Sequence, residues 1–166
     1  LETGFAVHIL RSSATGRYFY AVGRDGLVSL IDLWPEVPEI VATVKGCHDA
    51  RSIDGSKAIG WEDDFVIEGC YWPPQYVTYD GLTLEPLNLV DIREADGSMV
   101  DINGEPILEN RIAAMAASHT LPFWVVALKE SGYVGIVDYS IEGHPMVKKM
   151  ATEKFLHDGG FDSTGK

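Results

Sequence analysis

The amino-acid sequence predicts an all-β protein assembled from repeated antiparallel units. Short runs rich in β-branched and aromatic residues recur along the 166 residues, and Gly, Pro, Asp or Asn bound most of them. Apolar residues at helical spacing are nearly absent. Three similar strand–turn–strand units each end in an aspartate, at Asp32, Asp80 and Asp138, so the units follow one another at intervals of 48 and 58 residues. Such intervals are close to the roughly 40–50 residues of a four-stranded propeller blade.

Each unit is predicted from its own strand and turn signals. In the first unit, the Asp-Gly dipeptide at positions 25 and 26 supplies the positive φ angles of a tight hairpin turn. In the second unit residues 69–74 are expected to connect the strands, and in the third the connection is Ser131-Gly132. The expected strands are residues 17–22 and 28–33, residues 65–67 and 75–80, and residues 123–128 and 133–138.

Two further segments are less regular. Residues 109–118 are the one helix candidate, but this Ala-rich stretch equally fits a buried strand of small residues, because periodicity does not distinguish short apolar runs. Residues 93–110 are acidic and contain glycine, so we expect a long loop between the second and third units. Linkers rich in Gly, Ser and Pro are absent, and residues 1–166 are expected to form one domain without an internal boundary.

Three blades are too few to close a propeller, which has four to eight. An open stack of three would leave sheet edges unpaired. The chain also stops at Lys166 within what looks like a new repeat, and its first residue is Leu1 rather than methionine. We therefore expect this chain to be part of a larger propeller, with about three blades present.

The charge balance excludes several classes of partner. Thirteen Lys and Arg residues stand against twenty-five Asp and Glu residues, which leaves a formal net charge of −12. This charge would repel nucleic-acid phosphates and anionic lipid surfaces. No apolar run approaches the ~18 residues that cross a bilayer. We therefore expect neither nucleic-acid binding nor a membrane span.

Cysteine and histidine spacing argues against a local zinc site. Cys47 and Cys70 lack the Cys-x-x-Cys spacing of zinc knuckles, thioredoxin-type dithiols and c-type haem attachment, so we expect two buried free thiols. The nearest pair among the five histidines, His144 and His157, is thirteen residues apart, which is not a chelating spacing. A single axial histidine needs no such spacing, because a haem requires only one imidazole from the protein on one face.

Arginine placement suggests a second kind of site. Arg11, Arg24 and Arg51 each lie at or beside a predicted turn in a chain that is otherwise acidic. Surface ion pairing is the ordinary interpretation. The functional alternative is a carboxylate clamp, because guanidinium groups grip planar carboxylates bidentately and a propeller gathers residues from successive blades at one end of its channel.

Two short motifs also have two interpretations. His157 precedes Asp158-Gly159-Gly160, which is either a turn with a hydrogen-bonded histidine or a proton donor beside a cavity that admits a ligand close to the backbone. The Tyr71-Trp72-Pro73-Pro74 cluster suits core packing at a blade corner. Its aromatic rings also suit the face or edge of a tetrapyrrole.

These residues together resemble the haem d1 domain of the cytochrome cd1 nitrite reductases. The matching stretches run in family order over nearly the whole chain. They are residues 3–9, 16–18, 23–25, 31–34, 50–52, 71–75, 80–81, 83–86, 129–132 and 155–160. The resemblance implies an eight-bladed β-propeller with haem d1 in its central channel, of which this chain would be a part.

The resemblance also implies roles for individual residues. His8 falls on the proximal iron ligand, and His157 matches the first of two distal histidines, which would protonate bound nitrite. The second distal histidine would lie beyond Lys166. Family positions that line haem d1, where cations would neutralise its carboxylates, correspond to Arg11, Arg24, Arg51, Ser52 and Tyr71.

The resemblance implies one-electron reduction of nitrite to nitric oxide in the periplasm, as a step of denitrification. The electron donor would be a periplasmic cytochrome c or cupredoxin, and the full-length protein would be a homodimer. A c-type haem would belong to a part of the protein outside this sequence, because the chain has no Cys-x-x-Cys-His motif.

Two other functions remain as alternatives. A haem d1 carrier or biogenesis paralogue would hold the tetrapyrrole through the same residues without turning over nitrite. A plain propeller scaffold without a cofactor would leave His8 and the arginines without a ligand.

Overall fold

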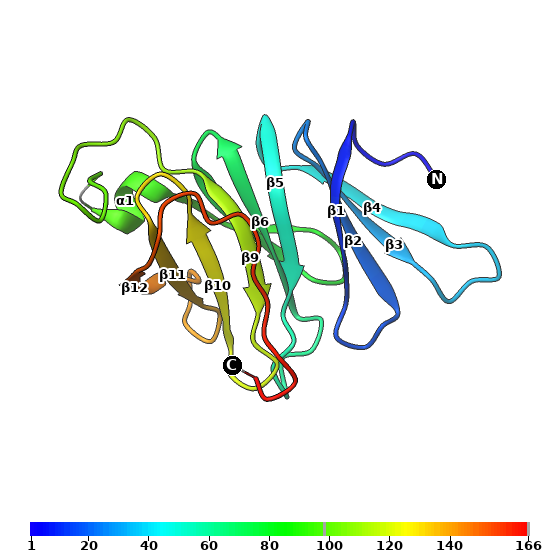
Figure 1. Ribbon diagram of the computed structural model, residues 1–166. Coiled ribbons are helices and arrows are strands. Elements are labelled where there is room, and N and C mark those ends of the chain that lie inside the picture. Colours follow the sequence, from blue (N-terminus) through cyan, green and yellow to red (C-terminus); the bar gives the residue numbers. More distant parts are fainter. Residues whose placement is uncertain (98, 166) are drawn as a thin grey trace.

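The computed structural model describes residues 1–97 and 99–165 and confirms the all-β prediction. Three four-stranded antiparallel sheets follow one another along the chain, each a simple meander (Figure 1). The first contains β1 (Val7–Ser12), β2 (Tyr18–Gly23), β3 (Leu27–Asp32) and β4 (Glu39–Lys45). The second contains β5 (Asp49–Gly55), β6 (Phe65–Trp72), β7 (Gln75–Asp80) and β8 (Pro86–Asp91). The third contains β9 (Ile112–Ala117), β10 (Phe123–Leu128), β11 (Tyr133–Asp138) and β12 (Met146–Ala151).

The internal repeat is visible in the strand register. In each sheet the aspartate that ends the third strand pairs with the first residue of the second strand: Tyr18 with Asp32, Phe65 with Asp80, and Phe123 with Asp138. The pairing between the third and fourth strands also shifts at the same place in all three sheets. Three equivalent sheets in one order are consistent with propeller blades.

Apolar cores form where neighbouring sheets pack together. One core lies between the first and second sheets and includes Tyr20, Leu30 and Tyr79. A second core lies between the second and third sheets and includes Ile67 and Trp124. The second sheet is therefore buried on both faces, which explains the nearly continuous burial of β6 and β7.

Three details of the predicted elements differ from the structure. Residues 112–117 form strand β9, so the helix candidate is wrong and the alternative of a buried strand is right. Strand β6 continues to Trp72, well beyond the predicted end at residue 67. The expected loop 93–110 begins within the short helix α1 (Ile92–Asp96), which ends at Gly97 with a left-handed φ of 72°. It also holds a bridge between Val100 and Pro106, while residue 98 lies outside the described residues.

The expectation of two free thiols is wrong. Cys47, which follows β4, forms a disulfide with Cys70 on β6, and their Cα atoms are 6.2 Å apart. That separation lies within the range that a disulfide requires. The two cysteines are 23 residues apart in sequence, and only the fold brings them together, where the connection out of the first sheet meets the second.

The first strands of the three sheets lie beside one another, and the C-terminal segment joins them. β1 contacts β5, and β5 contacts β9. After β12, the chain runs back across β9 and β10 to its C-terminus (Figure 1). Side chains on β1, β5, β9 and this last segment therefore share one side of the molecule. No helix in the described part of the chain has the length and apolar character needed to span a membrane.

Candidate functional site

His8, at the start of β1, is held by the backbone of β5. Its Nδ1 lies 3.0 Å from the carbonyl oxygen of Arg51. A carbonyl oxygen can only accept a hydrogen bond, so Nδ1 carries the hydrogen and donates it. In the neutral form of the imidazole, the other ring nitrogen, Nε2, then keeps its lone pair. A neutral imidazole with one nitrogen tied to a carbonyl in this way is the usual state of a histidine that ligates a metal.

Three cationic side chains surround the ring of Tyr71. The guanidinium carbons of Arg51 and Arg111 each lie 4.9 Å from the ring centroid, and Lys129 Nζ lies 5.0 Å from it. Lys129 Nζ also donates a hydrogen bond to the Tyr71 hydroxyl, at 3.2 Å. These contacts come from three different strands or strand ends, so the fold itself assembles the cluster. We call Arg51, Tyr71, Arg111 and Lys129 the Tyr71 cluster.

Only part of this positive charge is neutralised. Arg111 forms ion pairs with Glu130 at 2.5 Å and with Glu109 at 3.3 Å, and the hydrogen bond to Glu130 is the main cause that raises the Arg111 pKa. Within residues 1–97 and 99–165, by contrast, neither Arg51 nor Lys129 is paired with a carboxylate. The cluster therefore carries two unpaired cations in a chain whose net charge is −12.

Two buried polar atoms beside this cluster lack a partner in the part of the chain described. They are Nε of Arg51 and Oγ of Ser52. An unpaired buried donor costs free energy, because it has lost water without gaining a protein partner. A bound acceptor would remove that cost.

His157 lies close to His8 although 149 residues separate them. Their ring centroids are 6.1 Å apart in an edge-to-face arrangement. The His157 side chain is 49% exposed, and its Nδ1 lies 3.5 Å from Asp158 Oδ2. The segment before it is anchored by an ion pair of 2.8 Å between Lys154 and Asp101. The structure thus places both sequence-predicted histidines at one site.

The two remaining predicted arginines, Arg11 and Arg24, have different surroundings. Arg24 is 47% exposed and pairs with Asp49 at 3.8 Å, the geometry of an ordinary surface ion pair. Arg11 lies further along β1 and borders a different cavity, with Asp54 and Lys57. Among the described residues, no hydrogen bond, ion pair or ring contact connects either arginine to the Tyr71 cluster.

Sequence reasoning did not assign Arg111 or Lys129 to the site. One signal would have indicated Arg111. A basic residue lies near the start of the first strand of each sheet: His8 in β1, Arg51 in β5, and Arg111 just before β9. Lys129 had no comparable signal, because only the hairpin between β10 and β11 carries it to Tyr71.

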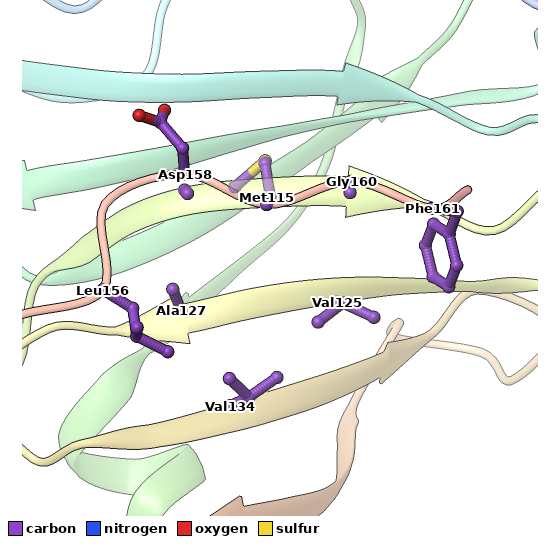
Figure 2. A pocket seen from close by; sticks show the side chains of 11 residues that line it. Met115, Val125, Ala127, Val134, Leu156, Asp158, Gly160 and Phe161 are labelled. Carbon is purple, nitrogen blue, oxygen red and sulfur yellow. The ribbon is translucent and has the colours of Figure 1, made fainter. Parts of the chain in front are cut away.

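An apolar cavity of about 240 Å³ lies under the C-terminal segment. Figure 2 shows Leu156 and Phe161 of that segment above Val125 and Val134 of the third sheet. The Asp158 carboxylate points away from these apolar side chains. Apolar side chains therefore dominate the lining of this cavity, which offers few polar groups to orient a ligand.

Comparison with known proteins explains the arrangement. The model of the Cytochrome D1 heme domain family matches residues 1–166, the whole chain. The chain belongs to the Cytochrome D1 heme domain family. Over 162 residues, this domain is 52% identical to a nitrite reductase of Stutzerimonas stutzeri, which covers 98% of the chain and 28% of that protein.

More distant relatives share the fold. The D1 heme domain is 27% identical over 150 residues to the dihydro-heme d1 dehydrogenase of Pseudomonas aeruginosa, covering 90% of the chain and 27% of the relative. The chain thus spans little more than a quarter of the length of the curated relatives that it matches. A solved structure of dihydro-heme d1 dehydrogenase NirN in complex with DHE aligns with a TM-score of 0.67 and 24% identity, over 95% of the chain and 31% of that structure.

Similarity of fold extends beyond this family. A chain in a crystal structure of the mitotic checkpoint complex aligns with a TM-score of 0.71, at only 14% identity, over 96% of this D1 heme domain chain and 44% of that one. The arrangement of four-stranded sheets is therefore shared by proteins with unrelated sequences. Function in this chain has to be argued from its site.

Proposed function

We propose that this chain is the haem d1-binding part of a nitrite reductase that forms nitric oxide. The observation that carries the proposal is the pairing of His8, whose Nε2 is free, with a cluster that holds two unpaired cations. An axial imidazole beside excess positive charge suits a metallated macrocycle that bears several carboxylates. The 52% identity to a nitrite reductase supports the same conclusion.

The residues present fit such a group. His8 would hold the iron, because its Nδ1–H is fixed by Arg51 O and its Nε2 lone pair is available. Arg51 Nε and Ser52 Oγ, both buried without a partner, would bind carboxylate oxygens. A Cβ added at Gly159 or Gly160 would meet nothing within 4 Å, so open space lies beside this backbone. Tyr71 would contribute its ring, and Arg11 and Arg24 would extend the positive lining.

The chemistry divides between the cofactor and the protein. When bound, haem d1 would supply the electron and the coordination position for nitrite. His157 would donate one proton to the departing oxygen and a second distal histidine would donate the other, so that nitrite, one electron and two protons give nitric oxide and water. Asp158 Oδ2 lies 3.5 Å from His157 Nδ1 and would help to orient the ring. His8 and His157, whose ring centroids are 6.1 Å apart, would both lie close to the group.

We extend the proposal to the whole protein. The three sheets would be three of eight blades around one channel, and residues 1–166 would belong to a single domain. The Cys47–Cys70 disulfide suits an oxidising compartment, which supports a periplasmic location and a role in denitrification. A cytochrome c or cupredoxin would deliver electrons through a c-type haem domain, in a homodimer.

The second candidate is a haem d1 carrier or biogenesis enzyme. The similarity to a dihydro-heme d1 dehydrogenase favours this alternative, because that relative covers 90% of the chain. Its identity is 27%, however, against 52% for the nitrite reductase. We therefore place the reductase first.

The test replaces His8 by alanine in the full-length protein. We expect haem d1 affinity, followed by absorbance during titration, to fall at least a hundredfold, because no other residue would supply the axial nitrogen. His48→Ala is the matched control, since His48 is also an exposed histidine near a strand start. A His8→Ala protein with wild-type absorbance and full occupancy would refute axial ligation.

Wild-type protein distinguishes the two candidate functions. It is loaded with haem d1, reduced by a competent electron donor, and mixed with nitrite. We expect nitric oxide to form at each turnover. Tight binding of haem d1 without any formation of nitric oxide would favour the carrier function over the reductase function.

A further inference from the structure

A buried carboxylate lies beside the disulfide that joins the first two sheets. Glu68 and Cys70 are two residues apart on β6, so their side chains point to the same face of the strand. Cys47 approaches them from the connection between β4 and β5, and one oxygen or sulfur atom of each residue lies within 4.8 Å of the others. Cys70 belongs to the core between the first and second sheets, whereas the Tyr71 ring contacts Arg111 beside the third sheet. This group is therefore separate from the Tyr71 cluster.

Glu68 is fully buried, yet no cationic side chain within the described residues pairs with it. Its Oε2 accepts a hydrogen bond from the Tyr79 hydroxyl at 2.5 Å. Its Oε1 lies 3.4 Å from Cys47 Sγ, and a disulfide sulfur has no hydrogen to donate. A buried carboxylate costs free energy unless a cation or enough donors satisfy it. The oxygen beside the disulfide thus lacks a partner that a cation would supply.

The spacing of these atoms matches the ligands of a tetrahedral zinc ion. Zn–S bonds of about 2.3 Å and Zn–O bonds of about 2.0–2.2 Å place neighbouring sulfur and oxygen ligands about 3.5 Å apart, and two sulfurs about 3.8 Å apart. Cys47 Sγ and Glu68 Oε1 already lie 3.4 Å apart. Breaking the S–S bond frees the Cys70 sulfur to move to the longer of these distances by rotation of its side chain.

We propose that Cys47, Glu68 and Cys70 bind Zn²⁺ when the disulfide is reduced. Two thiolates with one carboxylate suit this borderline-soft ion, whereas Ca²⁺ and Mg²⁺ require oxygen ligands. A dithiol supplies two electrons and two protons to the disulfide and is itself oxidised to a disulfide. Each cysteine then releases its proton to solvent as its sulfur binds the metal, and a water molecule completes the tetrahedron.

The surroundings of the three ligands favour this site. The Tyr79 hydroxyl fixes the second oxygen of Glu68, as groups around metal ligands commonly do. A Cβ at Gly46 would clash with the Glu68 carboxylate, so glycine allows the connection to pass close to it. A cavity of about 310 Å³ borders Gly46 and Tyr79 and offers the metal an entry path. Metal and disulfide are then alternative cross-links between this connection and β6.

The test uses full-length protein without haem d1, in an oxidised and a reduced form. The reduced form is purified anaerobically with a phosphine reductant present throughout, and thiol titration verifies that Cys47 and Cys70 are free. Zinc binding is measured by equilibrium dialysis, and X-ray absorption at the zinc edge counts the sulfur neighbours. The variants are Cys70→Ala and Glu68→Gln, with Glu39→Gln on the exposed face of β4 as the matched control.

We expect the reduced wild-type protein to bind one more Zn²⁺ per chain than the oxidised protein, with two sulfur neighbours at about 2.3 Å. Cys70→Ala should weaken this binding about a hundredfold or more, and Glu68→Gln about tenfold or more, because each variant removes a ligand. Zn²⁺ should also raise the melting temperature of the reduced wild type, since it binds the folded state more tightly. This rise requires no variant, so it remains decisive if Cys70→Ala does not fold.

Three results would overturn the proposal. The first is equal zinc binding by the reduced and oxidised forms, and the second is bound zinc without sulfur neighbours. The third is a zinc affinity of Glu68→Gln within about twofold of the Glu39→Gln control. None of these measurements involves haem d1, so a failure of the proposed function leaves them unaffected.

Discussion

Glu68 predicts a pH dependence of stability in the core between the first two sheets. Its side chain is fully buried, and burial is the main cause that raises its pKa from 4.5 to about 7. The Tyr79 hydroxyl donates a hydrogen bond to it at 2.5 Å, which partly opposes that rise. Oε1 lies 3.4 Å from Cys47 Sγ. A disulfide sulfur has no hydrogen, so only protonated Glu68 can donate a hydrogen bond there.

The sign follows from the direction of the pKa change. The folded state binds this proton more tightly than the unfolded state, so the stabilisation is complete below pH 4.5 and is lost as the pH rises through about 7. At about 1.4 kcal/mol for each pH unit, the difference between the two pKa values corresponds to about 3 kcal/mol. Glu68→Gln should abolish this loss, because an amide stays neutral and its oxygen still accepts from Tyr79.

Native-state hydrogen exchange of the β6 and β7 amides measures the effect in the full-length protein. The opening free energy is compared for wild type and Glu68→Gln at about pH 4.5 and about pH 8. We expect the difference in opening free energy, Glu68→Gln minus wild type, to be about 3 kcal/mol larger at the higher pH than at the lower pH. A difference between the two proteins that is the same at both pH values would refute the reasoning.

Four further predictions concern the site and its supports. Arg51→Ala should weaken haem d1 binding about tenfold or more in absorbance titrations, and Arg51→Lys should restore only part, because an ammonium lacks the guanidinium fork. His157→Ala should slow nitric oxide formation by ~10²–10⁴-fold while haem d1 occupancy is unchanged; an unchanged rate excludes proton donation. Cys70→Ala should lower the unfolding free energy by about 2–5 kcal/mol in denaturant titrations of oxidised protein. The Lys154 hydrogen bond lowers the Asp101 pKa to about 2, so the stabilisation is present above pH 3.8 and lost as the pH falls through about 2. Asp101→Asn should remove this acid dependence and increase proteolysis between β12 and His157.

The fold was predictable wherever local signals agreed with it. The paired strands around Asp32 and Asp138 end where turn residues and alternating apolar residues indicate. The end of β6 was not predictable in this way, because Gly69 is a turn-forming residue in most contexts. Here its missing side chain leaves room for Ile112 and Met115, which a Cβ at Gly69 would meet at 2.6 Å. Packing between sheets, which no local window contains, decides that the strand continues.

The site was predictable only in part. His8, Arg51, Tyr71 and His157 were identified by resemblance, and the structure brings them together at one end of β1 and β5. Lys129 became visible only through the fold, because it reaches Tyr71 across 58 positions of sequence. The Cys47–Cys70 bond was missed for the same reason, since pairing depends on distances that sequence spacing does not encode.

The crowding of cations around Tyr71 has a consequence for assembly of the holoprotein. Like charges held within about 5 Å of one ring repel each other, so their repulsion opposes the fold that gathers them. An anionic ligand relieves that repulsion only in the folded state, and by mass action it shifts the folding equilibrium toward the native protein. Cofactor loading and folding are then thermodynamically coupled, and chains that have not acquired their ligand would be the ones preferentially removed by proteases.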